Sequence, residues 1–240
     1  MPQDISGYDV GALLYCPANA HHTVAQAVAA ERLPRPFSLA LCLEDTVRAD
    51  ALAAAEQAVE QTLHDLTDAA RQETFYRPLT FVRVRSPEQL ARLGRAYGKY
   101  RPLLTGFILP KFFIETCGAY CAVIRDLQAD GLDYFYMPVF EAPSMLPLHT
   151  RHAALAEVKA QLDALREYIL NIRVGGNDLC HVFGLRRDPG HTIYDLRPVA
   201  DVLTDLLTAF APDYLVAGPV WEYYDGPGWA EGLAQECALD

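Results

Sequence analysis

Charged side chains end five short apolar runs in this sequence, and the spacing between them is nearly regular. The runs read FSLALCLED, LTFVRVR, GFILPK, YFYMPVFE and LNIRVGGND, and their charged residues include Glu44, Asp45, Arg83, Lys111, Glu141 and Asp178. Counted from Glu44, successive charged positions lie 39, 28, 30 and 37 residues apart, about the length of one strand followed by one helix. Carboxylates bind hard divalent cations, and arginine or lysine binds anionic groups. These residues are therefore the candidates for binding a metal ion or an anionic substrate.

The apolar runs are nearly continuous, which is typical of strands that are covered on both faces. Such strands belong to parallel sheets, and parallel strands place their C-terminal ends on the same side of the sheet. The charged residues are then expected to converge on one rim, where barrels of this class form their active sites. The pattern therefore predicts an enzyme.

The elements that would position these residues alternate between strands and helices, as in a (β/α)8 barrel of the TIM type. Only seven strands are recognisable, and the eighth is missing from the sequence as it stands. No linker or repeat divides the chain, so residues 1–240 are predicted to form one domain. The predicted strands are 10–17, 37–45, 79–85, 106–111, 134–141, 170–178 and 213–225. The predicted helices are 22–32, 49–72, 87–100, 112–129, 150–169, 197–210 and 226–236, with a long loop over 180–196.

Composition limits the partners. The chain has 240 residues, is 51% hydrophobic and carries a formal net charge of −11, which argues against nucleic acid or an anionic membrane as a partner. A small anionic substrate fits if local arginines receive it. No apolar run is long enough to span a membrane, and the first residues lack a signal-peptide pattern. The six cysteines form no C-x-x-C pair. We therefore expect a cytoplasmic protein.

Taken together, the motifs LCLEDTV, FVRVR, ILPK, VFE and GGND resemble the citrate lyase β-subunit-like family, within the HpcH/HpaI aldolase superfamily. These are carbon–carbon bond lyases on a (β/α)8 barrel. The opening LLYCPAN resembles the family's first-strand motif, with Ala18 where glycine is usual. The segments VGGNDLCHVFGLRR, TIYD and GPVWEYYD resemble a narrower branch found beside tellurite-resistance genes.

This resemblance implies a Mg²⁺-dependent cleavage next to a carbonyl, or the reverse reaction, with Mn²⁺ as a possible substitute. By position, Glu141 and Asp178 match the metal carboxylates, and Arg83 matches the arginine that binds the substrate. Glu44 and Asp45 match the acidic pair that orients that arginine and the metal's waters. The resemblance also implies a coenzyme A thioester as one possible substrate, and a homotrimer or homohexamer.

Each assignment has a plainer alternative. Glu141 and Asp178 could be solvated strand-end acids or helix caps, and Arg83 could form a purely structural ion pair. For the enzyme as a whole, the alternative is a non-catalytic barrel that serves as a binding or scaffold protein in a stress-response complex. Retention of all five motif residues favours the enzyme.

Four further residues are predicted to contact the substrate together with Arg83, and each of them also has a structural alternative. Lys111 could bind a carboxylate or form a rim salt bridge, and Gly176 could allow close backbone approach or mark a bulge. Arg186, with Arg187, could form a cationic lid or contact another subunit. Trp221 could shape the pocket or pack beneath the loop. The family usually has asparagine at the position of Arg85, so a more cationic site is expected here.

Overall fold

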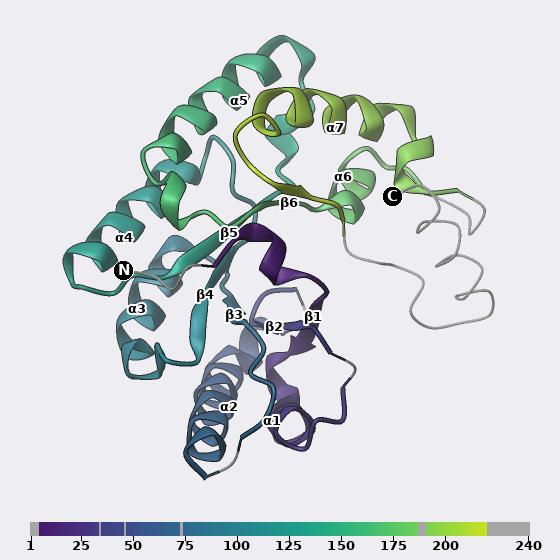
Figure 1. Cartoon of the computed structure of the whole chain (residues 1–240). Coiled ribbons are helices and arrows are strands. Elements are labelled where there is room, and N and C mark those ends of the chain that lie inside the picture. Colours follow the sequence, from purple (N-terminus) through teal and green to yellow (C-terminus); the bar gives the residue numbers. More distant parts are fainter. Residues whose placement is uncertain (1–4, 34, 46, 73, 187–190, 220–240) are drawn as a thin grey trace.

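In the computed structural model, seven parallel strands form one curled sheet in the order β1 to β7, with helices on its outer side (Figure 1). The structure describes residues 5–33, 35–45, 47–72, 74–186 and 191–219. The predicted α/β barrel class is confirmed, as a half-barrel that lacks one strand within the described residues. Parallel neighbours throughout the sheet mean that all the strands end at the same rim.

Helices alternate with strands along most of the chain, as the sequence predicts. The strands are β1 (Leu13–Pro17), β2 (Ser38–Cys42), β3 (Thr80–Arg83), β4 (Leu104–Leu109), β5 (Phe135–Phe140), β6 (Ile172–Val174) and β7 (Val216–Ala217). The helices are α1 (His21–Ala29), α2 (Leu52–Gln72), α3 (Pro87–Ala96), α4 (Cys117–Ala129), α5 (Leu148–Asp163), α6 (Gly176–Val182) and α7 (Arg197–Phe210). Among the described residues, no helix is long and apolar enough to cross a membrane.

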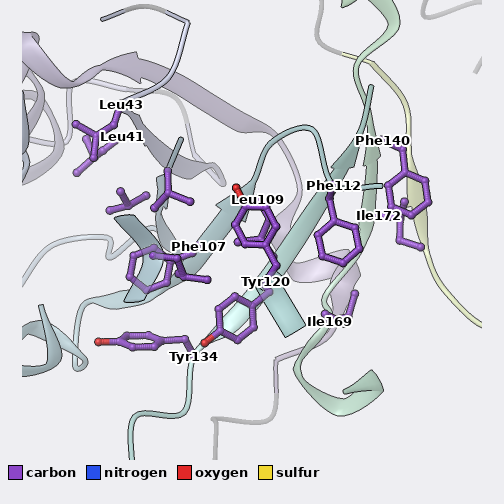
Figure 2. Close-up of a cluster of buried hydrophobic side chains, with 14 of the residues drawn as sticks. Leu41, Leu43, Phe107, Leu109, Phe112, Tyr120, Tyr134, Phe140, Ile169 and Ile172 are labelled. Carbon is purple, nitrogen blue, oxygen red and sulfur yellow. The ribbon is translucent and has the colours of Figure 1, made fainter. Parts of the chain in front are cut away.

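The core has two parts, one on each face of the sheet. Leu39 and Leu41 of β2 belong to the large outer cluster between sheet and helices, and Figure 2 shows Leu41 there with Phe107, Tyr134 and Phe140. Ala40, between the two leucines, belongs to the smaller cluster inside the curl with Phe81 and Ile108. Because both faces are covered, the strands need apolar residues at nearly every position, which explains the continuous runs.

Two boundaries differ from the prediction in ways that affect the rim. The helix expected from Phe112 begins only at Cys117, because the backbone N–H of Phe112 donates to the Val139 carbonyl at 3.0 Å and extends the pairing of β4 with β5. The strand expected over 170–178 ends at Val174. Residues 176–182 form α6 instead, so Asp178 lies in the first turn of a short helix.

Candidate active site

The strand ends bring four predicted site residues together. Arg83 is the last residue of β3, and it lies in register with Cys42, the last residue of β2. Glu44, Lys111 and Glu141 follow the ends of β2, β4 and β5 within two residues. The predicted convergence of charges on one rim is thus observed for these side chains.

Arg83 is the centre of the cluster. Its Nη2 atom lies 2.7 Å from Oε2 of Glu44, 3.1 Å from Oε1 of Glu141 and 3.5 Å from Oδ2 of Asp45. The Arg83 side chain is only 11% exposed. Burial alone would lower the pKa of Arg83, but the carboxylates of Glu141 and Glu44 raise it above its ordinary value. Arg83 is therefore a permanent cation.

Arg83 keeps hydrogen-bond donors that no described residue uses. The three carboxylate contacts all converge on Nη2, while the buried Nε has no hydrogen-bond partner among the described residues. The guanidinium carbon lies 5.9 Å from the centre of the Tyr15 ring. A buried N–H without a partner is costly, so the geometry suits an arginine that completes its hydrogen bonds with a ligand.

Lys111 links two of the acids through different atoms. Its Nζ lies 3.0 Å from Oε1 of Glu44, and its backbone N–H donates to Oε1 of Glu141 at 3.0 Å. Its φ angle is +50°, a backbone conformation that is uncommon for residues other than glycine. The hydrogen bond to Glu44 raises the pKa of Lys111. A Schiff-base role needs a lowered pKa, so Lys111 is better suited to binding an anion.

Glu141 is a carboxylate buried at a cost. Burial raises its pKa to about 7; Arg83 opposes this rise, and the nearby charge of Asp178 adds to it. Gly175 allows this packing, because a Cβ at that position would lie 2.2 Å from Oε2 of Glu141. Gly176, the predicted substrate contact, packs instead toward Ile193 and Pro219. Gly175 is thus the glycine that touches the acid.

The rim carries uncompensated negative charge. Burial raises the pKa of Glu44, and so does its neighbour Asp45. The Oε2 atom of Glu44 is buried and outside hydrogen-bond geometry, although it lies close to Arg83. Three carboxylates (Glu44, Asp45 and Glu141) lie within 4.0 Å of the two cations Arg83 and Lys111, and Asp178 is a fourth acid whose charge raises the pKa of Glu141. This arrangement leaves an excess of two negative charges, which one divalent cation would neutralise.

The residues present fit a magnesium ion. Mg²⁺ is commonly held by one or two carboxylates and keeps several waters. Among the described residues, no group of three or more histidine, cysteine or acidic side chains could hold a metal. The fit therefore rests on a pair of carboxylates. The pair predicted from the sequence is Asp178 together with Glu141, whose raised pKa reflects the unfavourable burial of its charge.

Arg85 has a role that differs from the expected one. Its Nε donates to the Leu43 carbonyl at 2.6 Å, and its Nη2 donates to the carbonyls of Glu44, at 3.1 Å, and Val47. The guanidinium therefore holds the segment that carries Glu44 and Asp45. Because its donors bind backbone carbonyls, Arg85 positions the acids more directly than it binds a substrate.

Two other predicted contacts are not shown to join this cluster. Arg186 is exposed after α6, near the end of a described segment. Trp221 lies outside the described residues, as does Arg187. The sequence reasoning also missed Tyr15 and Arg173, although the alternation of apolar and polar residues in IRV gives the same signal at Arg173 that FVRV gives at Arg83.

A curled parallel sheet with acids and an arginine at its carboxyl rim defines a class of barrel enzymes in which the chemistry is done at that rim. The particular family follows from the sequence. Residues 4–240 match the model of the family described as C-C bond lyase of the TIM-barrel fold, and the chain belongs to that family. It is thus a carbon–carbon bond lyase by family. No curated protein sequence matches the chain.

Solved structures agree with the fold. The citrate lyase β subunit from M. tuberculosis, complexed with oxaloacetate and magnesium, has a TM-score of 0.59 at 21% identity, covering 95% of this chain and 86% of its own. RipC from Yersinia pestis has a TM-score of 0.58 at 16% identity, with coverages of 96% and 84%. The Haloferax volcanii malate synthase ternary complex with pyruvate and acetyl-CoA reaches 0.65 at 10% identity, with coverages of 99% and 65%.

Proposed function

We propose that this protein is a Mg²⁺-dependent lyase or aldolase that cleaves or forms a carbon–carbon bond in a small hydroxy-carboxylate or its thioester through an enolate. The observation that carries this proposal is the buried Arg83, held by Glu44 and Glu141 in a rim with excess negative charge. A purely structural ion pair would need one carboxylate for one guanidinium. Here three carboxylates lie near the guanidinium, and its Nε has no hydrogen-bond partner in the described part of the chain.

Each residue of the cluster has a separate role in the proposed reaction. Glu141 and Asp178 would hold the metal, which as a Lewis acid would stabilise negative charge that develops on a carbonyl oxygen. Arg83 offers its unused donors to the substrate carboxylate, because a guanidinium matches carboxylate geometry. Glu44 and Asp45 keep Arg83 in place, and Lys111 lies beside them as a second cation for the substrate. Burial of Arg83, Glu44 and Glu141 strengthens the interactions among them by excluding water.

The relatives support the substrate class without fixing the substrate. The M. tuberculosis structures hold magnesium with oxaloacetate, and magnesium with acetoacetate and coenzyme A. A coenzyme A thioester is therefore included in the proposal, as is Mn²⁺ in place of Mg²⁺. Substrate contacts by Gly176, Arg186 and Trp221 stay predictions. So do the single domain over 1–240, the homotrimer or homohexamer, the cytoplasmic location and the link to tellurium resistance.

The test is a calorimetric titration of Mg²⁺ and Mn²⁺, with and without oxaloacetate, pyruvate or acetyl-CoA. Wild type should bind the metal, and one of the ligands should tighten that binding. Asp178→Asn should lose metal binding and keep its fold by circular dichroism. Asp126→Asn, which changes an exposed acid on α4, should behave as wild type. Metal affinity that is equal in Asp178→Asn and wild type would refute the site.

A further inference from the structure

Arg173 is a cation inside the curl of the sheet that the rim cluster does not use. It lies in β6 between Ile172 and Val174, which are buried in the outer cluster between sheet and helices. Side chains alternate between the two faces of a strand, so Arg173 lies on the inner face. Its register partner on β5, Val139, belongs to the inner cluster. The strand register and the alternation of side chains thus both place the Arg173 side chain on the inner face of the sheet.

The inner face at Arg173 lies next to the candidate active site. Val139 precedes Glu141 by two residues, and Arg173 precedes Gly175 by two, so each pair shares a face of its strand. Gly175 packs against Glu141, which places Arg173 one step beneath the rim, about 7 Å along the strand at a rise of about 3.3 Å per residue. The side chain of an arginine is long enough to span that step.

Tyr15 connects the two arginines electrostatically. Its ring lies inside the curl, packed against the inner cluster, with the guanidinium of Arg83 5.9 Å from its centre. Burial raises the pKa of the Tyr15 hydroxyl, while the charges of Arg173 and Arg83 lower it, Arg173 more than Arg83. Tyr15 thus lies within the electrostatic reach of both guanidinium groups.

Arg173 differs from Arg83 in its partners. Arg83 has three carboxylates, whereas Arg173 is half-buried and has no hydrogen-bond or ion-pair partner in the part of the chain that the structure describes. A partly buried guanidinium without a counter-ion is costly. One divalent cation would neutralise the rim. The charge of Arg173 would still have no acid beside it among the residues that the structure describes.

We propose that Arg173 is a specificity residue that binds a second carboxylate of the substrate, beneath the carboxylate that Arg83 receives. The site would then select small dicarboxylates over monocarboxylates that carry the same reacting carbonyl. This assignment rests on the proposed function for the position of the first carboxylate. Arginine suits the task because its planar fork can bind a carboxylate through two hydrogen bonds.

The first experiment compares oxaloacetate with pyruvate, which lacks the second carboxylate, by calorimetry in saturating Mg²⁺. Wild type should bind oxaloacetate more tightly than pyruvate. Arg173→Gln should weaken oxaloacetate binding about 10- to 100-fold, the range expected for a lost charge-assisted contact, with less than about threefold change for pyruvate. Arg173→Lys should retain part of the preference. Arg166→Gln, which removes an exposed arginine paired with Asp213, is the matched control and should bind both acids as wild type does.

A second pair of ligands separates the two proposals. Succinate and propionate differ by one carboxylate, and neither has a keto group that a metal would activate. They are therefore titrated without metal, and binding is followed by NMR. If wild type prefers succinate and Arg173→Gln abolishes that preference, the result supports the role of Arg173. Failure to find metal-dependent binding of oxaloacetate or pyruvate would refute the proposed function and leave the role of Arg173 standing. An unchanged oxaloacetate preference in Arg173→Gln, or an equal loss for both keto acids, would overturn the role of Arg173. So would the lack of a succinate preference in wild type.

Discussion

Burial of Glu141 should make the metal-free protein less stable at neutral pH than a variant that lacks this charge. The change to test is Glu141→Gln, which keeps an acceptor for the Lys111 backbone N–H and removes the charge. Burial raises the pKa of Glu141 from 4.5 to about 7. A shift of that size corresponds to at most about 3 kcal/mol, and relaxation around the ion pair with Arg83 should reduce the effect to about 1–3 kcal/mol.

The sign follows from proton binding. Between pH 4.5 and about 7 the folded protein holds a proton on Glu141 that the unfolded chain releases. The free energy of unfolding of wild type should therefore fall across this window as the pH rises. The Gln variant has no such group. The difference in free energy of unfolding between Glu141→Gln and wild type should therefore be close to zero at pH 4 and reach its full value by pH 8.

The assay is urea unfolding at pH 4, 6 and 8 in EDTA, followed by circular dichroism. Glu157→Gln, at an exposed position on α5, is the control and should follow wild type at every pH. If Glu141→Gln is less stable than wild type at pH 8, then the ion pair with Arg83 more than offsets the cost of burial. The view of Glu141 as a charge held at the expense of stability would then be wrong.

Two other variants test the packing around the site. Gly175→Ala places a Cβ 2.2 Å from Oε2 of Glu141, so it should destabilise the protein by at least about 1 kcal/mol and weaken Mg²⁺ binding in calorimetry; Gly118→Ala, where the added Cβ meets an ordinary contact at 3.5 Å, should do neither. Asp205→Asn should lower the free energy of urea unfolding by about 1–3 kcal/mol, because it leaves the buried Arg151 without its carboxylate at 2.8 Å. The exposed pair Arg197–Asp201 offers the control Asp201→Asn, which should change stability by less than about 0.5 kcal/mol.

The sequence was informative about the rim because parallel strands impose a simple rule. Continuous apolar runs that end in charges predict strand ends on one side, and Glu44, Arg83, Lys111 and Glu141 are found there. The helix predicted from residue 87 also begins there, because the Ser86 hydroxyl caps it by accepting from the backbone N–H of Gln89 at 3.3 Å.

Features that depend on contacts across strands were not visible in the sequence. Which of the two glycines touches Glu141 depends on where β6 ends, and that end is set by the start of α6 rather than by the apolar pattern. Likewise, the donors of Arg85 bind carbonyls of the 43–47 segment. No property of the residue type distinguishes this role from substrate binding.

The two arginines on the inner face show why this rim is better explained by ligand binding than by structure. A fold that needed only stability would pair each buried guanidinium with one carboxylate, because excess charge of either sign costs desolvation energy. Here Arg83 has three carboxylates and an unpaired Nε, while Arg173 has no carboxylate in the described chain. Carboxylates outnumber cations at the rim, whereas the position of Arg173 beneath the rim has a cation without a described carboxylate. A divalent cation above and a second substrate carboxylate below would correct both imbalances at once, so the two ligands should bind more tightly together than either does alone.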